Sequence, residues 1–598
     1  MKKLTELLKE HKIAFILAVL TSVLCALPQA YFRIDHTELY QDNVEDIEML
    51  VSSNWSPRVR EVMDGHPNWG SIYFKDGKEG PYLFQPLGSI VVAYTGELFG
   101  FGINNTILLS RIIFPFLTFI LMYAFVFLLS RNKLAALAST SAILLVDFLV
   151  SPSGIKAILT GEVVNRIHSV NFLEISHPVN SSMIFVFFFG FLVTFFLFYQ
   201  KWKWQWGVVS TLLLGLNFYN YFYSWTFLFS FGGVLCFVLA LQKKWKEVFR
   251  VVYVFVGALV VAIPYIWNLY SATQHTTYVE LSLRHGVLVS HAPLFIGATT
   301  LCALVVFLFG FPRADKQKYV FGLSLLLATM VVLNQQIITG KVLQVGHYHW
   351  YIHKPLAVIF VVMTLFSLLD RWSVPRHYKR LLAVSMILIS FAIGTKIQAL
   401  SYMDDGVGKG GDGIGMTLER QKYAPIMDWL NAHAEKESVV FANELTSNIV
   451  VIYTPLNVFH HHADHLTLPA TDERLQDLIF TYYRLRGVGE ENVEEVFQSE
   501  KLFIATRLTG IHSREKDGND GSIPDEVFDG VVLNYRHTLS TPTSEWLYDI
   551  WKKYEVEYLV WDKNVDPTWR LEQYSFLKEE ATFGDIAIYS FSRENSSI

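Results

Sequence analysis

The sequence predicts a polytopic α-helical membrane protein that ends in an extracytoplasmic α/β domain. Hydrophobic residues make up 52% and aromatic residues 15% of the 598-residue chain. The apolar residues gather in long blocks, and the composition changes abruptly near Met403. A soluble globular chain rarely shows such a composition together with such blocks, so the first 400 residues are expected to lie largely in a membrane.

The membrane-spanning helices are predicted from the lengths of the apolar blocks. A helix needs roughly 20 apolar residues to cross a bilayer, and about eleven blocks approach that length. These blocks are Ile13–Leu27, Ile107–Leu129, Leu134–Val150, Met183–Tyr199, Trp206–Tyr223, Trp225–Leu241, Val251–Trp267, Leu294–Phe311, Val320–Leu333, Pro355–Leu369 and Leu381–Gly394.

Basic residues predict the orientation of these helices, because short cytoplasmic loops collect Lys and Arg. A basic cluster precedes the first block and follows every second block: Lys2/Lys3/Lys9/Lys12, Arg131/Lys133, Lys201/Lys203, Lys243/Lys244/Lys246/Arg250, Arg313/Lys316/Lys318 and Arg371/Arg376/Lys379/Arg380. The N-terminus is therefore expected in the cytoplasm, with the first block as a signal anchor and everything after Ala399 outside. An apolar run at 84–101 carries Pro86 and Glu97, and counting it as a span would reverse this order. It is predicted to be a re-entrant or interfacial helix.

Three regions follow from this pattern. Residues 1–400 form the transmembrane domain, with a first outer loop at 28–106, and residues 401–420 form a Gly/Asp-rich linker. Residues 421–598 form the soluble α/β domain. Its apolar periodicity predicts helices at 423–432, 472–485 and 545–554, and strands at 438–442, 449–453, 557–561 and 585–591.

The first outer loop is acidic. Its carboxylates are Asp35, Glu38, Asp42, Glu45, Asp46 and Glu48. Such residues are either solvated loop charge or catalytic groups held at the membrane surface. The spacing of the last four also fits one exposed face of a surface helix, so both interpretations stand at this point.

Two further outer loops carry ionisable groups close to the hydrocarbon, where such groups are functional candidates. Residues 161–180 include Glu162, Arg166, Glu174 and His177. Residues 334–354 include Lys341, His347, His349 and Lys354 beside Tyr348, Trp350 and Tyr351. The second loop is suited to binding a phosphate at the interface, although an ordinary aromatic-belt loop is the alternative.

This combination of an acidic first outer loop, about eleven spans and an outer α/β domain resembles the GT-C superfamily of membrane glycosyltransferases. Members commonly carry a functional Asp or Glu in the first outer loop and use a polyprenyl-phosphate-linked sugar. Asp35 matches that acid by position. His36 stands where protein O-mannosyltransferases carry Glu, and the WWDYG and HEPD motifs of two other subfamilies are absent, so no subfamily is assigned.

The resemblance implies transfer of a sugar, with inversion, from a lipid-linked donor to a glycan, lipid or protein acceptor outside a plasma membrane. A carboxylate would take the acceptor's proton, with Asp35 the first choice and Asp42 the second. Cations would stabilise the departing phosphate: Lys341, His347, His349 and Lys354, then Arg166 and Arg284. A divalent cation, Mg²⁺ or Mn²⁺, could bind to Glu45, Asp46, Glu162 and His177.

Other interpretations stay open. The run His460, His461, His462, Asp464, His465 could bind zinc, face a substrate or form a plain polar loop. Many spans also suit a transporter or lipid flippase, although no inverted repeat is visible. A non-catalytic protein that binds envelope polymer is a third possibility. The net charge of −5 gives no support for a nucleic-acid partner.

Overall fold

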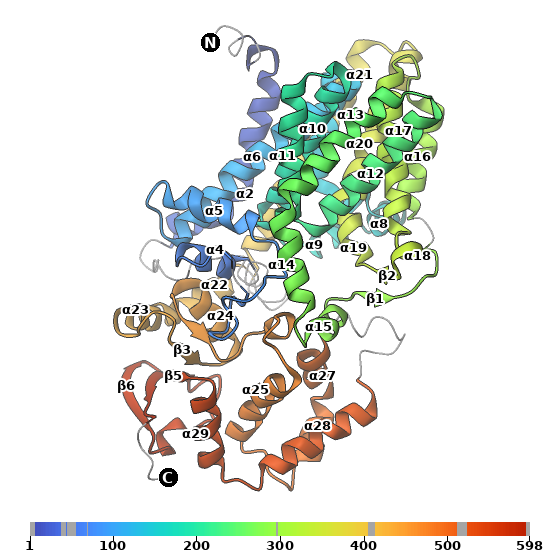
Figure 1. Cartoon of the computed structure of the whole chain (residues 1–598). Helices are drawn as coiled ribbons and strands as arrows, with labels where there is room; N and C mark the ends of the chain where they lie inside the picture. Colours follow the sequence, from blue (N-terminus) through green and yellow to red (C-terminus); the bar gives the residue numbers. More distant parts are fainter. Residues whose placement is uncertain are drawn as a thin grey trace.

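The computed structural model describes residues 6, 8–36, 44, 55–68, 70–294, 297–404, 413–510 and 523–593. Figure 1 shows a bundle of long helices, with a smaller domain of short helices and one sheet at one end of it. Short helices from the loops of the bundle lie between the two parts. This arrangement confirms a helical membrane protein with an α/β domain.

Eight helical segments among the described residues are long and apolar enough to cross a membrane. They are α2 (Lys12–Asp35), α6 (Ile103–Ser130), α7 with η1 (Lys133–Val150), α10 (Asn180–Lys201), α12 (Phe222–Leu241), α17 with α18 (Lys316–Thr339), α19 with η3 and α20 (Val345–Arg371), and α21 (Arg376–Tyr402). The chain is thus a multi-pass membrane protein.

The three other predicted blocks are also largely helical. The helices α13 (Trp245–Val261) and α14 (Ile263–Thr273) meet at a bend of 56° and count as a ninth span if they are taken together. Pro264 explains the bend, because it lacks the N–H that would continue the helix. The helices α11 (Trp204–Asn220) and α16 (Ala298–Gly310) are shorter. The total of about eleven stays a prediction.

Short elements occupy the loops on the side of the soluble domain. The run predicted to be a re-entrant or interfacial helix contains the helix α5 (Leu87–Glu97). The other elements are α4 (Ser56–Met63), α8 (Pro152–Thr160), α9 (Val163–His168), η2 (Glu174–Ser176), α15 (Tyr278–Arg284) and the two-stranded ribbon of β1 (Leu288–Val289) and β2 (Lys341–Val342).

The soluble domain contains a mixed five-stranded sheet in the order β4-β3-β5-β7-β6. The strands β3 (Val439–Phe441), β4 (Asn457–Val458) and β5 (Val556–Asp562) run parallel, whereas β6 (Leu577–Phe583) and β7 (Ile586–Phe591) add antiparallel pairs. Its helices are α22 (Ile414–Arg420), α23 (Ala424–His433), α24 (Glu444–Tyr453), α25 (Asp472–Leu485), α26 (Val493–Ser499), α27 (Lys501–Thr509), α28 (Asp525–Thr538) and α29 (Thr543–Lys553), with the short turns η4 (Gln421–Tyr423), η5 (Asp464–Leu466) and η6 (Leu571–Gln573).

One strand prediction is wrong. Residues 449–453 belong to the helix α24 and not to a strand. The side chain of Asn443 accepts a hydrogen bond from the N–H of Thr446 and so caps the helix N-terminus. Every residue from Thr446 to Tyr453 is buried, so the sequence carries no helical alternation of polar and apolar positions.

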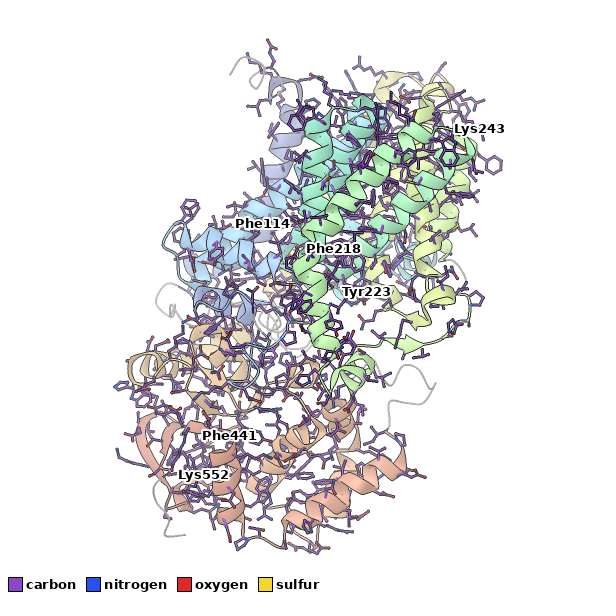
Figure 2. All side chains as sticks on the ribbon, viewed as in Figure 1. Phe114, Phe218, Tyr223, Lys243, Phe441 and Lys552 are labelled. Atoms are coloured by element: carbon purple, nitrogen blue, oxygen red, sulfur yellow. The ribbon has the colours of Figure 1, made fainter. Side chains whose placement is uncertain are left out.

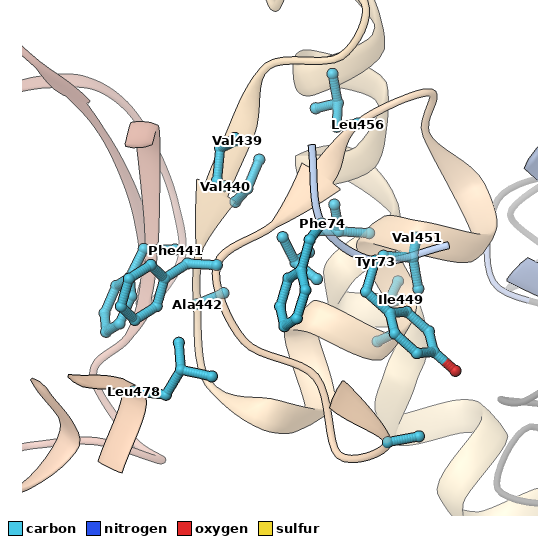
Figure 3. Packing of buried hydrophobic residues seen from close by; sticks show 14 of the residues in the cluster. Tyr73, Phe74, Val439, Val440, Phe441, Ala442, Ile449, Val451, Leu456 and Leu478 are labelled. Carbon is cyan, nitrogen blue, oxygen red and sulfur yellow. The ribbon is translucent and has the colours of Figure 1, made fainter. Parts of the chain in front are cut away.

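The first outer loop packs into the soluble domain. Figure 3 shows Tyr73 and Phe74 beside Val439, Val440 and Phe441 of the parallel strands. The N–H of Val458 donates a 2.9 Å hydrogen bond to the carbonyl of Tyr73. The two segments therefore share one hydrophobic core although nearly 400 residues separate Phe74 and Val458 in the sequence.

Ion pairs strengthen the same contact. The ammonium of Lys78, which is almost fully buried, lies 2.9 Å from Glu61 within the loop and 2.8 Å from Glu437 of the soluble domain. Arg474 donates to both carboxylate oxygens of Asp76 at 2.7 Å, and its guanidinium covers the ring of Phe74. These charged contacts hold the domain against the bundle.

Candidate functional site

A polar cluster lies at the end of the bundle that faces the soluble domain. In Figure 2, Tyr223 at the start of α12 and Lys243 just after α12 mark opposite ends of the bundle, and Tyr223 is on the side of the soluble domain. The cluster consists of residues at helix ends and in connecting segments. We call it the bundle-end cluster and define it as Asp147, Glu174, His177, His349, Tyr351 and Lys354, with the aromatic group of Tyr221, Tyr223 and His347 beside it.

The carboxylate of Glu174 forms one half of this cluster. The hydroxyl of Tyr351 donates a 2.7 Å hydrogen bond to it, and Nε2 of His177 lies 3.6 Å from its other oxygen. The amide of Asn180 donates a 2.8 Å bond to the Tyr351 hydroxyl. This chain of bonds joins the segment before α10 to the start of α20.

The ammonium of Lys354 forms the other half. It pairs with Asp147, which follows α7 directly. His349 is close enough to both groups to interact with them electrostatically. Residues His349–His353 adopt a π-helical turn, a wider turn that often occurs at functional sites. The turn lies immediately before Lys354.

An aromatic group adjoins the cluster. The hydroxyl of Tyr221 and Nδ1 of His347 are 2.5 Å apart, and the His347 ring stacks on Tyr223 at 4.7 Å between centroids. Tyr221 also meets the ring of Tyr351 edge-on. Aromatic side chains with polar tips are typical of the membrane–water interface, so the cluster has the composition of an interfacial site.

Glu174 is embedded in protein and yet accessible to solvent. Its side chain is 45% exposed to solvent, and the side chain of Asp147 is 28% exposed. Burial among neighbouring groups favours the neutral acid, but the charge of His177 and the hydrogen bonds from His177 and Tyr351 outweigh it and lower the pKa of Glu174 to about 2. An ionised carboxylate is therefore accessible to incoming ligands, within range of the charge of the buried Lys354 ammonium.

The structure brings only part of the predicted site together. His347, His349 and Lys354 share the bundle end with His177. Asp35 is the last residue of α2; it is 45% exposed and lies 3.5 Å from the ring of His36. No contact described here joins Asp35 to Lys354.

Three predicted cations lie elsewhere. Lys341 is exposed on the β1–β2 ribbon. Arg166 of α9 donates to the hydroxyl of Ser169, the residue that follows this helix. Arg284 is buried and pairs with Glu280 at 2.7 Å and with Asp472 of the soluble domain at 2.8 Å. Its contacts connect the two parts of the protein.

The predicted metal site stays a prediction, because only Glu162 and His177 of its four ligands are among the described residues. Glu45 and Asp46, like the second-choice base Asp42, lie outside the described residues. His177 contacts Glu174, and no described contact joins it to Glu162. Within the described ranges, no group of three or more His, Cys, Asp or Glu side chains is arranged to hold a metal ion.

The histidine run of the soluble domain is a packed loop. His460 pairs with Asp464 at 2.8 Å, and the buried ring of His461 stacks on Tyr73 at 3.7 Å. The side chain of His462 bonds to Asn448. Among the described residues, no three side chains of this run are arranged to hold a metal ion, and the contacts of the run are those of a polar loop packed against the first outer loop.

Sequence reasoning missed two members of the bundle-end cluster. Asp147 is not among the candidates named from the sequence, and Tyr351 is named only as part of an aromatic loop, because nothing in the sequence links positions 147 and 351 to positions 354 and 174. One signal was available: Asp147 and Lys354 are both ionisable groups near an end of an apolar block, and such groups usually pair.

The fold and the site thus define a multi-pass membrane protein with a charged interfacial cluster under an α/β domain. No protein-family model matches the sequence, and no curated protein matches it. Two solved structures are similar in fold, both crystal structures of ArnT from Cupriavidus metallidurans. The apo structure has 12% identity, covers 90% of this chain and 93% of that chain, and gives a TM-score of 0.43. The structure bound to undecaprenyl phosphate has 12% identity, 97% coverage of both chains and a TM-score of 0.41. At these values the similarity assigns no function and no site residue.

Proposed function

We propose that this protein is a membrane glycosyltransferase that moves a sugar from a polyprenyl-phosphate donor to an acceptor outside the plasma membrane. The observation that carries this proposal is the bundle-end cluster, in which the charge of the buried Lys354 ammonium acts on the ionised and accessible Glu174. A lipid phosphate enters at the level of the head groups, and this is the level at which interfacial aromatic residues surround the cluster.

Lys354 stabilises the phosphate as it leaves. Its ammonium is held by Asp147, and a phosphate that carries more negative charge competes with that carboxylate for the same cation. His347 and His349 supply ring N–H groups on the same side. Glu174, with a pKa of about 2, is too weak a base to take a hydroxyl proton near neutral pH, so it orients His177 and Tyr351.

The base is a different carboxylate. Asp35 remains the residue proposed for it, because it ends the first span on the side of the soluble domain and its carboxylate is accessible. It would accept the proton of the acceptor hydroxyl while the oxygen attacks C1 of the sugar and the C1–phosphate bond breaks on the opposite face. Inversion at C1 follows from this in-line geometry.

A transporter or flippase is the second candidate, and the position of the cluster disfavours it. Transporter sites lie near the bilayer midplane, where discontinuous helices meet. Here the charged groups sit at helix ends, and a soluble domain large enough to hold an acceptor faces them. The proposed orientation, with the N-terminus in the cytoplasm, places this end outside the cell.

The test is transfer of radiolabelled sugar from a panel of polyprenyl-phosphate sugars to envelope extract by the purified protein. We expect one donor to be consumed with the release of polyprenyl phosphate, and Lys354→Met to reduce the rate by a factor of about 10²–10³. The matched control is Lys156→Met, which removes an exposed lysine of α8. Consumption of no donor by folded protein would overturn the proposal, as would equal rates for the two variants.

A further inference from the structure

A second pocket lies in the soluble domain, away from the bundle-end cluster. It has a volume of about 220 Å³, and its walls come from the segments that follow three parallel strands: 442–445 after β3, His460 after β4, and Val565, Asp566 and Trp569 after β5. The helices α25 and α27 close the other side. Sites outside the carboxyl ends of parallel strands are the usual place for ligands in open α/β sheets.

The walls of this pocket are mostly apolar and aromatic. Phe441, Tyr482, Phe503 and Trp569 supply the rings, and Leu445, Leu478, Ile479 and Val565 supply aliphatic surface. The flat faces of such rings pack well against the C–H groups of a sugar ring. The pocket is smaller than the roughly 300–1,000 Å³ of sites for drug-sized molecules, so it suits one small ring.

The polar groups that line the pocket are mostly hydrogen-bond acceptors, and few of them carry a positive charge. The Asp566 carboxylate accepts a 2.9 Å bond from the amide of Asn443, and among the described residues it forms no ion pair. Arg507 pairs with Glu444 and also donates to the carbonyl of His462 at 2.8 Å. His460, which also lines the pocket, bonds to Asp464 through its Nδ1.

This balance of charge excludes a phosphate as the preferred ligand. Two carboxylates face the pocket, and its single guanidinium is already neutralised by one of them. Carboxylate, amide and imidazole groups instead suit the hydroxyls of an uncharged ligand, which both donate and accept hydrogen bonds. Aromatic faces combined with such groups match a neutral sugar ring.

The pocket adjoins a larger one of about 680 Å³, and both share Glu444, Phe503 and Arg507 as lining residues. The larger pocket is also lined by His465 and by Arg284 of α15, a helix from an outer loop of the bundle. A chain of sugars seated in the small pocket could therefore extend through the larger one toward the membrane domain.

We propose that the small pocket of the soluble domain binds one neutral sugar unit of a glycan, with Tyr482 and Asp566 as its main contacts. The proposal rests on the proposed transferase function only for the expectation that the acceptor is a glycan. Binding is measured without transfer, so the two proposals can fail separately. Sugar transfer without glycoside binding would contradict only the proposal for the pocket. Glycoside binding without sugar transfer would contradict only the proposed transferase function.

The test is saturation-transfer NMR and calorimetry on the full chain in nanodiscs, with a panel of methyl hexosides and pentosides at millimolar concentration. We expect at least one glycoside to bind, and Tyr482→Ala and Asp566→Ala each to weaken its binding at least tenfold. The matched controls are Tyr558→Ala and Asp585→Ala, which remove an aromatic ring and a carboxylate of the same domain that line neither pocket. Their affinities should equal that of the unmodified protein.

A farnesyl-phosphate-linked sugar provides the second arm. Used as a competitor, it should displace the pocket-bound methyl glycoside no more effectively than unlabelled methyl glycoside does, because the two carboxylates repel its phosphate. Failure of every glycoside to bind would overturn the proposal. Glycoside binding that persists in both pocket variants would also overturn it, as would displacement of the bound glycoside by a tenfold lower concentration of the phosphate-linked sugar.

Discussion

Lys354 at the start of α20 forms an ion pair with Asp147 at the end of α7, 207 residues earlier in the chain. The lysine is almost fully buried, whereas the aspartate keeps 28% of its exposure. An ammonium in such a place is stable only with a counter-ion, so the pair fixes the ends of two helices relative to each other. The same pair determines how much positive charge is available to a ligand.

Loss of Asp147 should destabilise the protein. Asp147→Asn leaves the Lys354 ammonium buried without a carboxylate, and we expect the free energy of unfolding to fall by about 1–3 kcal/mol. Titration with sodium dodecyl sulfate, followed by fluorescence, measures this change. The double variant Asp147→Asn/Lys354→Met should be more stable than Asp147→Asn alone, because it also removes the unpaired charge.

The control for that experiment is Asp370→Asn. Asp370 pairs with Lys379 at the opposite end of the bundle, where the carboxylate is 52% exposed. Exposed pairs contribute about 0–1 kcal/mol, so this variant should be close to the unmodified protein. An equal decrease in the free energy of unfolding for the two variants would show that the Asp147–Lys354 pair stabilises the protein no more than an exposed ion pair does.

The ionisation of Glu174 should make the bundle end sensitive to acid. The pKa of Glu174 in the folded protein is about 2, below the ordinary value of 4.5, because His177 and Tyr351 stabilise the anion against the opposing effect of burial. A lowered folded pKa gives stability that is complete above pH 4.5 and is lost as the pH falls toward 2. Thermal unfolding between pH 6 and pH 3 should therefore depend on pH less in Glu174→Gln than in the unmodified protein. Parallel pH profiles would contradict this assignment.

The proposed base is tested by Asp35→Asn. The substitution keeps the size of the side chain and removes its basicity, so transfer should slow by a factor of about 10²–10⁴ while donor binding is kept. Single-turnover transfer and equilibrium binding of the donor lipid are measured side by side. Glu97→Gln, at the exposed end of α5, is the control and should retain full activity. Full activity in Asp35→Asn would move the base to the acids of residues 38–48.

Much of the fold could be predicted because its signals are local. Apolar blocks and basic clusters indicated the helices of the bundle, and alternating patterns indicated β3, α25 and β5. The helix α24 is not predicted from the sequence because burial of every residue from Thr446 to Tyr453 removes the amphipathic pattern. The bundle-end cluster depends on contacts between residues far apart in the sequence, such as Tyr351 and Glu174, and periodicity carries no information about those pairs.

The shared core makes the stability of the soluble domain depend on the first outer loop. Phe74 is completely buried against that domain, so Phe74→Ala should cost about 3–5 kcal/mol and should lower amide protection in β3 and β4. Hydrogen exchange followed by mass spectrometry locates the loss. Phe99→Ala, which truncates a 56% exposed ring of the same loop, should change neither quantity. Loss of protection confined to the loop itself would show that the domain folds without it.

The histidine run gives the soluble domain a separate response to pH. Burial lowers the pKa of His461 well below its ordinary value, and it lowers the pKa values of His462 and His465 to about 4. Arg507 opposes their protonation, and Asp464 favours that of His462 and His465 without reversing the shift. The unfolded chain takes up protons below pH 6.5 and the folded domain does not, so stability should fall between pH 6.5 and about pH 4, by at most about 1.4 kcal/mol per pH unit for each group.

Replacing one of these histidines should flatten that profile. His465→Gln removes one group that must stay neutral in the fold, so the unfolding midpoint should change less between pH 7 and pH 4.5 than in the unmodified protein. His537→Gln is the control, because His537 is exposed at the end of α28. This response acts above pH 4.5, whereas that of Glu174 acts below it, so the two variants separate acid unfolding of the soluble domain from that of the bundle end. A profile unchanged by His465→Gln would mean that this ring is already protonated in the folded domain, with Asp464 as its counter-ion.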